Sequence, residues 1–181
     1  MNTSIDTPLF RESQSLRRWL LWLPFLALTL LFVWGIIRQE VFHTPFGDKP
    51  APSIILAVLA VFMGILAYLF LAAQLDVEIH NDSIRYRFFP FVPSWRTVRA
   101  VDVQSAYVRT YHPILEYGGW GYRAMPGFMG KGKALNISGN QGIQLVFTDG
   151  ARLLLGTRRP ADAQQALEKS SGLSPLVKHD A

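Results

Sequence analysis

The sequence predicts a membrane-anchored α+β protein, in which two apolar helices precede a small β-rich domain that ends in one helix. Three observations support this fold class. Residues 53–73 form a 21-residue run without a charge, and a helix rising about 1.5 Å per residue over that length crosses a hydrocarbon layer of about 30 Å. A second uncharged run, of 19 residues, occupies 19–37. The chain after Ala73 alternates apolar and polar residues, as strands do.

Composition restricts the function classes. Half of the 181 residues are hydrophobic because of the two apolar runs, and the net charge is +5. After Ala73 the chain carries 13 Lys and Arg against 9 Asp and Glu, an excess more typical of a cytoplasmic membrane flank than of a nucleic-acid-binding domain. The absence of cysteine excludes disulfides and thiolate catalysis. The four histidines lack metal-ligand spacing, so no metal or cofactor is expected.

The chain begins with a polar segment, residues 1–15, in which no period is evident, and we expect a flexible tail there. The run 19–37 is longer than the apolar core of a signal peptide and lacks a small-residue cleavage site, which favours a spanning helix. Residues 16–73 therefore form a transmembrane hairpin with its loop at 38–52. The charges of that loop cancel, whereas arginines flank the hairpin on both sides: Arg11, Arg17, Arg18, Arg85 and Arg87. This asymmetry predicts a plasma-membrane protein with both termini in the cytoplasm.

A β-hairpin is predicted directly after the second span. Residues 75–80 and 84–89 alternate on either side of Asn81-Asp82, a turn signal. Pairing across that turn sets apolar residues against apolar residues and acids against arginines, whereas a slip of one residue destroys both matches. The expected pairs are Ile79–Ile84, Val77–Tyr86, Leu75–Phe88, Glu78–Arg85 and Asp76–Arg87.

An aromatic loop, residues 88–95, follows this hairpin. The second strand returns by about the length of the first, so the loop is expected beside the bilayer surface. Two interpretations stay open: Phe89, Phe91 and Val92 enter the headgroup region, or the aromatic side chains pack on the domain.

The remaining chain predicts further short strands and one helix. Strand patterns occupy 96–100, 103–111, 142–148 and 151–155, and Asp149-Gly150 is a hairpin turn signal. A helix is expected at 161–170, between Pro160 and Gly172, with a narrow stripe of Ala163, Ala166 and Leu167 that covers the last strands.

Three motifs carry a family resemblance: EYGGWGYR from Glu116, GKALNISGNQGIQL from Gly132 and DGARLLLGTRRP up to Pro160. They resemble an uncharacterised group of bacterial membrane proteins with two transmembrane helices and a pleckstrin-homology-like (PH-like) domain. The resemblance implies a PH-like antiparallel β-barrel of about seven strands over 74–172, closed by the C-terminal helix and followed by a tail, 173–181. It also implies binding or assembly at the membrane rather than catalysis.

The sequence therefore favours a non-enzymatic binding or assembly module at the membrane, with self-association or another membrane protein as its partner and without a small-molecule or nucleic-acid substrate. The alternative is a sensor of anionic lipid headgroups. A third function, a hydrolase or transferase in the loop 117–133, requires a pocket that gathers His112, Glu116 and Arg123. The stretch 127–134 matches G-x-x-x-x-G-K but lacks the following Ser or Thr of a phosphate loop. Candidate contact residues are Phe89, Phe91, Val92, Trp120, Arg123, Lys131, Lys133, Arg158 and Arg159.

Overall fold

The structure, a computed structural model, describes residues 7–15, 19–124 and 132–176. The chain forms two compact units. Residues 16–73 make the helical unit, and the residues before and after it together make the β unit. The helical unit is thus an insertion within the sequence of the β unit.

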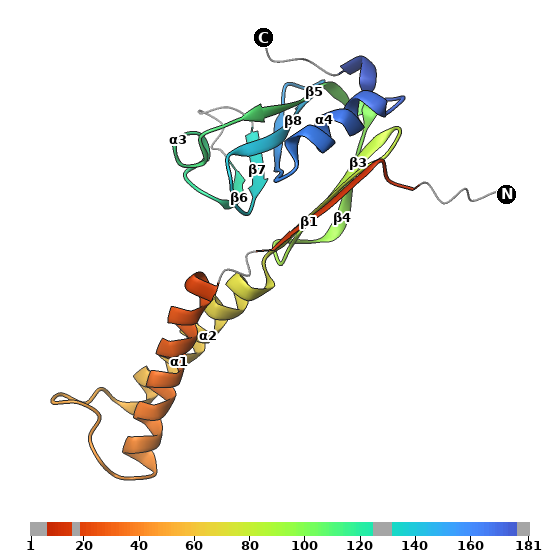
Figure 1. The fold of residues 1–181 in the computed structure, drawn as a ribbon. Helices are drawn as coiled ribbons and strands as arrows, with labels where there is room; N and C mark the ends of the chain where they lie inside the picture. Colours follow the sequence, from red (N-terminus) through yellow and green to blue (C-terminus); the bar gives the residue numbers. More distant parts are fainter. Residues whose placement is uncertain (1–6, 16–18, 125–131, 177–181) are drawn as a thin grey trace. The chain divides into compact units, whose positions relative to one another are not determined.

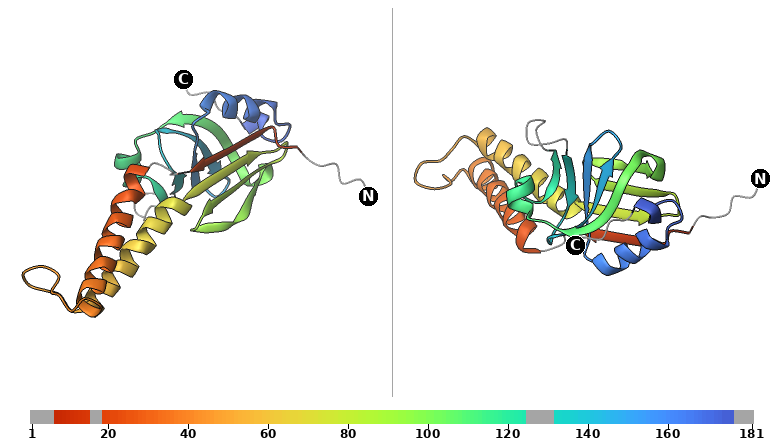
Figure 2. Two further views of the ribbon diagram at one scale, coloured as in Figure 1. Left: turned by 60° about the horizontal axis from the view of Figure 1, so that its bottom comes forward. Right: turned by 90° about the horizontal axis from the view of Figure 1, so that it is seen from above.

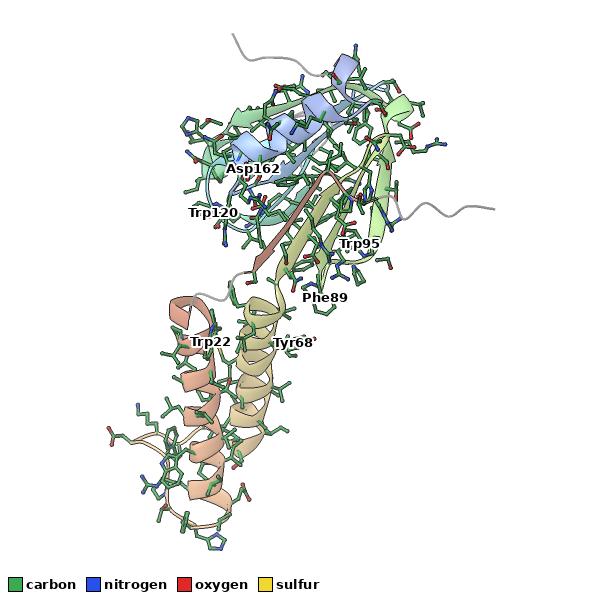
Figure 3. All side chains as sticks on the ribbon, turned by 45° about the vertical axis from the view of Figure 1, so that its right-hand side comes forward. Trp22, Tyr68, Phe89, Trp95, Trp120 and Asp162 are labelled. Atoms are coloured by element: carbon green, nitrogen blue, oxygen red, sulfur yellow. The ribbon has the colours of Figure 1, made fainter. Side chains whose placement is uncertain are left out.

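The helical unit contains two long apolar helices, α1 (Trp19–Glu40) and α2 (Ser53–Ala72), which pack against each other. The rings of Phe25 and Phe70 stack between them with centroids 5.2 Å apart. The two predicted helices are confirmed, although α1 continues three residues beyond Ile37. Trp22 lies on α1 and Tyr68 on α2 (Figure 3), and most outward side chains are apolar. Both helices are long and apolar enough to cross a membrane.

The β unit contains two sheets and one long helix (Figure 1). Sheet A has the order β1-β2-β3-β4, with β1 at Phe10–Ser15, β2 at Gln74–Ile79, β3 at Ser83–Phe89 and β4 at Val92–Arg99. Sheet B has the order β5-β8-β9-β7-β6, with β5 at Val103–Thr110, β6 at Gly121–Ala124, β7 at Gly132–Asn136, β8 at Gln141–Phe147 and β9 at Arg152–Gly156. Strands β7 and β9 are parallel.

The predicted closed antiparallel barrel is wrong. Among the described residues no strand of sheet A pairs with a strand of sheet B. The 3-10 turn η1 (Ala100–Asp102) separates β4 from β5, so the ladder of hydrogen bonds ends there and the chain begins a second sheet.

The predicted flexible tail is wrong over Phe10–Ser15, because these residues form β1. Strand β1 pairs antiparallel with β2 from Phe10–Ile79 to Ser15–Gln74. Its inward residues include Glu12 and Gln14, which are polar, so the usual apolar alternation is missing from the sequence. Residues 1–6 of that tail lie outside the described residues.

The predicted register of the β2–β3 hairpin is confirmed in all five pairs. The predicted aromatic loop 88–95 is wrong, because β3 continues through Phe89 and β4 begins at Val92. Only Pro90 and Phe91 form the turn, and Val92 lies opposite Phe88 in the sheet.

Helix α4 (Pro160–Lys169) buries Ala163, Ala166 and Leu167, the predicted stripe. It packs against β1 and β2 of sheet A and against β5 and β8 of sheet B (Figure 2). The fold extends past Gly172, where a tail was predicted, because Leu173 is fully buried and the 3-10 turn η3 (Ser174–Leu176) contacts β5.

Candidate functional site

A short helix, α3 (Pro113–Tyr117), is fixed to sheet B by Arg109 of β5. The guanidinium of Arg109 donates to Oε2 of Glu116 at 2.7 Å, to the hydroxyl of Tyr117 at 3.3 Å and to Oε1 of Gln144 at 3.1 Å. The second carboxylate oxygen of Glu116 accepts the backbone N–H of His112 at 2.8 Å. The hydrogen bond from Arg109 holds the pKa of Glu116 below its ordinary value.

The buried Tyr111 packs against the last residue of this helix. The ring of Tyr111 is 6.0 Å from that of Tyr117 in an edge-to-face contact. The hydroxyl of Tyr111 accepts a hydrogen bond from Nδ2 of Asn136 at 2.8 Å. Oδ1 of Asn136 in turn accepts a hydrogen bond from the backbone N–H of Gly121 at 2.8 Å. Burial raises the pKa of both tyrosines, so neither phenol serves as a base near neutral pH. We call the set the polar cluster: Arg109, Tyr111, Glu116, Tyr117, Asn136 and Gln144.

Sequence reasoning missed the polar cluster as a unit. Its members come from β5, the residue after it, α3, β7 and β8, and only the fold brings them together. One signal was available, because Glu116 and Asn136 lie in the motifs that carry the family resemblance. Among the described residues, no buried polar side-chain atom of the cluster lacks a hydrogen-bond partner, so the cluster can act as a structural support for α3.

Large apolar side chains project from the supported segment into solvent. Leu115 is 85% exposed, Ile114 65% and Trp120 45%; we call these three the α3 surface. The indole N–H of Trp120 donates to the carbonyl of Gly139 at 2.9 Å, and Nε of Arg123 donates to the carbonyl of Trp120 at 3.2 Å. Two predicted contact residues, Trp120 and Arg123, therefore lie together, and Figure 3 marks Trp120.

Between the two sheets lies a hollow of about 270 Å³, which we call the sheet mouth. Tyr86 lines it from sheet A, and sheet B with its β8–β9 turn contributes the rest. The lining side chains of sheet B and its turn include Lys133, Phe147, Ala151, Arg152 and Leu153. Lys133 is thus the predicted contact residue that lines a hollow between the sheets, whereas Lys131 lies outside the described residues.

The predicted aromatic contacts lie at the end of sheet A where β1 and β2 meet the helical unit in sequence. Ser15, Gln74 and Phe89 form one row across the sheet there. Phe91 stacks on Phe88 at 5.8 Å and on Tyr122 at 6.3 Å, yet it remains 58% exposed. Phe91 therefore packs partly on the domain, and insertion of Phe89, Phe91 or Val92 into headgroups stays a prediction.

The predicted arginine contacts are bonded within the β unit. Arg158 donates to Oγ of Ser138 at 2.9 Å. Arg159 pairs with Asp162 at 2.7 Å and lies over the ring of Phe10 at 5.4 Å. Strand β1 also binds this segment, because Glu12 accepts the hydroxyl of Thr157 at 2.6 Å and the backbone N–H of Arg158 at 2.9 Å.

Sheet A carries paired charges on the face opposite to that of Glu12 and Val77. Arg87 contacts Asp76 at 2.6 Å and lies over the ring of Trp95 at 4.9 Å; Trp95 and Phe89 are marked in Figure 3. Burial acts to raise the pKa of Asp76, but hydrogen bonds from Gln74, Ser13 and Arg87 outweigh it, so this pKa lies below its ordinary value.

The third function is not tested, because residues 125–131 of its loop, which include most of the G-x-x-x-x-G-K stretch, lie outside the described residues. His112, Glu116 and Arg123 line neither the sheet mouth nor a second hollow between β1 and α4. In the part of the chain that the structure describes, no group of three His, Cys, Asp or Glu side chains could hold a metal ion.

Comparison with protein families gives an extensive match. The model of a family of unknown function, DUF6141, matches residues 1–172. The chain belongs to the DUF6141 family. The match includes β1, the helical unit and the β unit through Gly172, so the insertion of the helices between β1 and β2 falls within the DUF6141 match. A search of curated proteins finds no match.

Proposed function

We propose that this protein is an integral protein of the bacterial plasma membrane whose β unit is a non-enzymatic, PH-like binding or assembly module on the cytoplasmic side. The α3 surface is the observation that carries the proposal. Exposed leucine and tryptophan side chains, on and directly after a helix that part-buried hydrogen bonds hold in place, are typical of a protein-binding surface.

The pairing of β1 with β2 supports the membrane topology. Strands of one sheet lie on the same side of a membrane, so α1 and α2 either both cross it or both stay out of it. Cleavage of α1 as a signal peptide would remove β1 and leave Thr157 without its carboxylate partner. The apolar outer surface of both helices favours crossing by both.

Cysteine labelling tests this topology, because the natural chain contains no cysteine. Asp48→Cys lies between the two helices and Ser171→Cys follows α4, and both positions are exposed. In intact cells a membrane-impermeant maleimide is expected to label Asp48→Cys, and to label Ser171→Cys only after lysis. Labelling of both positions from outside would contradict the proposed topology.

We expect the assembly to be self-association through the α3 surface. Leu115→Glu is expected to convert an oligomer of the full chain in detergent to a monomer, because a charge at a desolvated contact is costly. Val101→Glu is the matched control, since Val101 is 76% exposed on η1, outside the α3 surface. Light scattering after size-exclusion chromatography gives the mass. A monomeric natural chain, or equal effects of the two variants, would argue against self-association.

A second function, the sensing of anionic lipid headgroups, is favoured by the cations at the sheet mouth. Lys133 and Arg152 line it. Arg158 and Arg159 are exposed but also bonded within the β unit, and their contact with lipid stays a prediction. A preference of the full chain for anionic over zwitterionic lipid that weakens with salt would support this function.

A further inference from the structure

We propose that the sheet mouth binds the phosphate-bearing head of an anionic amphiphile. This inference deepens the second proposed function and does not depend on self-association. It assigns a site between the two sheets, away from the arginines that sequence reasoning placed at the lipid.

The placement of Lys133 is the first argument. Within sheet B its Cα partners are Ala124 on β6 and Leu153 on β9, so Lys133 shares a face with Leu153. Leu153 is buried and lines the sheet mouth. Lys133 itself is exposed, so its ammonium group lies at the solvent end of this face, on the rim of the sheet mouth. Strand β7 lies between β6 and β9, so this charge does not protect a sheet edge.

A second exposed cation, Arg96, comes from sheet A, beside the tyrosine that lines the mouth. Arg96 is the Cα partner of Tyr86, which lines the mouth. Burial raises the pKa of the Tyr86 phenol, and the positive charge of Arg96 acts against that rise, which places the two groups close together. The hydroxyl of Tyr86 stays protonated at neutral pH and can donate a hydrogen bond to an anion.

The third argument is that these charges are uncompensated. Arg96 and Lys133, with Arg152 at the mouth, have no ion pair among the described residues, and no carboxylate is among the residues that line the hollow. Positive charge beside a low-dielectric wall concentrates anions. Lysine and arginine donate charge-assisted hydrogen bonds to phosphate oxygens.

The size and walls of the mouth indicate the ligand class. The floor is apolar, with Phe147, Ala151 and Leu153 facing the ring of Tyr86. A volume of about 270 Å³ is at the lower end for ligand sites, which span roughly 300–1,000 Å³. It suits a glycerophosphate head with a short apolar portion rather than a whole diacyl lipid. A phospholipid head and a free phosphate ester share this chemistry.

Titration calorimetry on the full chain in nonionic detergent tests the site. The probes are dihexanoyl-phosphatidylglycerol, dihexanoyl-phosphatidylcholine and free glycerol phosphate. The natural chain is expected to bind the glycerol lipid more tightly than the choline lipid. Lys133→Gln is expected to weaken binding about tenfold, because one charge-assisted hydrogen bond is lost. Tyr86→Phe is expected to weaken it several-fold, and Lys169→Gln, the same exchange on α4, is expected to leave it unchanged.

The probes separate the sources of the phosphate. Tighter binding of the lipid than of glycerol phosphate supports a membrane headgroup, and the reverse order supports a soluble phosphate ester. If Lys133→Gln and Lys169→Gln change the affinity for the anionic lipid equally while the natural chain still prefers that lipid, the proposed site is wrong. Headgroup sensing elsewhere on the protein would then remain as the function. Absence of any preference for the anionic lipid in the natural chain overturns both. Unchanged far-ultraviolet circular dichroism of the variants shows that folding is not the cause.

Discussion

Sheet A and sheet B are built by different rules, although they belong to one unit. The strands of sheet A lie in chain order, and β2 and β3 match by register: apolar against apolar, acid against arginine. Sheet B has the order β5-β8-β9-β7-β6 and contains a parallel pair. Its most distinctive interactions are those of the polar cluster, whose members come from separate strands and α3. Local pairing thus decides the β2–β3 hairpin of sheet A, whereas long-range hydrogen bonds decide the polar cluster of sheet B.

The two sheets also differ in how they relate to the membrane segment. The β1–β2 connection of sheet A contains the whole helical unit, whereas the connections of sheet B lie within the β unit. Sheet A therefore depends on a strand that is distant in sequence. The two sheets are expected to respond differently to substitution and to acid.

The largest expected effect is that of removing β1. We expect a chain in which residues 16–73 are replaced by Asn-Gly to be soluble and β-rich, because Ser15 and Gln74 are directly opposite and a two-residue turn can join them. A chain that begins at Gln74 lacks β1 and exposes an apolar edge, so aggregation is expected. Circular dichroism and thermal unfolding compare the two. Equal cooperative unfolding would show that β1 is dispensable.

The next effect concerns the polar cluster of sheet B. Tyr111→Ala removes a buried ring and is expected to cost about 3–5 kcal/mol of the free energy of unfolding. Tyr111→Phe keeps the ring but leaves Nδ2 of Asn136 without its acceptor, at a cost of about 1–3 kcal/mol. Denaturant unfolding of the soluble chain just described gives both values. Equal losses would mean that packing around the ring contributes nothing beyond the hydrogen bond.

A smaller effect is expected from the buried carboxylate of β1. Glu12→Ala removes the acceptor of Thr157 and Arg158 and is expected to destabilise by about 1.5–3 kcal/mol. Arg11→Ala on the same strand is the control, because its pair with Glu78 is exposed on the arginine side and is worth at most about 1 kcal/mol. Comparable losses would contradict a specific role for Glu12.

The smallest effect is the dependence of stability on acid. Both Asp76 of sheet A and Glu116 beside sheet B have pKa values lowered in the folded state. The unfolded chain therefore takes up these protons first, and the stabilisation is present above the unfolded pKa of about 4 and is lost as the pH falls through the folded pKa. Asp76→Asn and Glu116→Gln are expected to flatten the decline of the melting temperature below pH 5. An unchanged slope in either variant would exclude that carboxylate as a source.

The outcome of the sequence predictions follows the same division between the sheets. The β2–β3 register is correct because Glu78–Arg85 and Asp76–Arg87 can be matched only one way across a short turn. The buried stripe of α4 is correct because helical spacing is local. Strand β1 was missed because Glu12 and Gln14 occupy inward positions, and their hydrogen-bond partners lie more than a hundred residues further along the chain.

The sequence by itself determined the two apolar helices, the hairpin that follows them and the helix that covers the last strands, because period, charge matching and turn residues act over a few neighbouring positions. Only the tertiary structure decided that β1 joins sheet A, that the strands form two sheets instead of a barrel, and that Arg109, Tyr111 and Asn136 meet. Those features depend on hydrogen bonds between groups that are far apart in the chain, and a pattern along the sequence contains no distance between such groups.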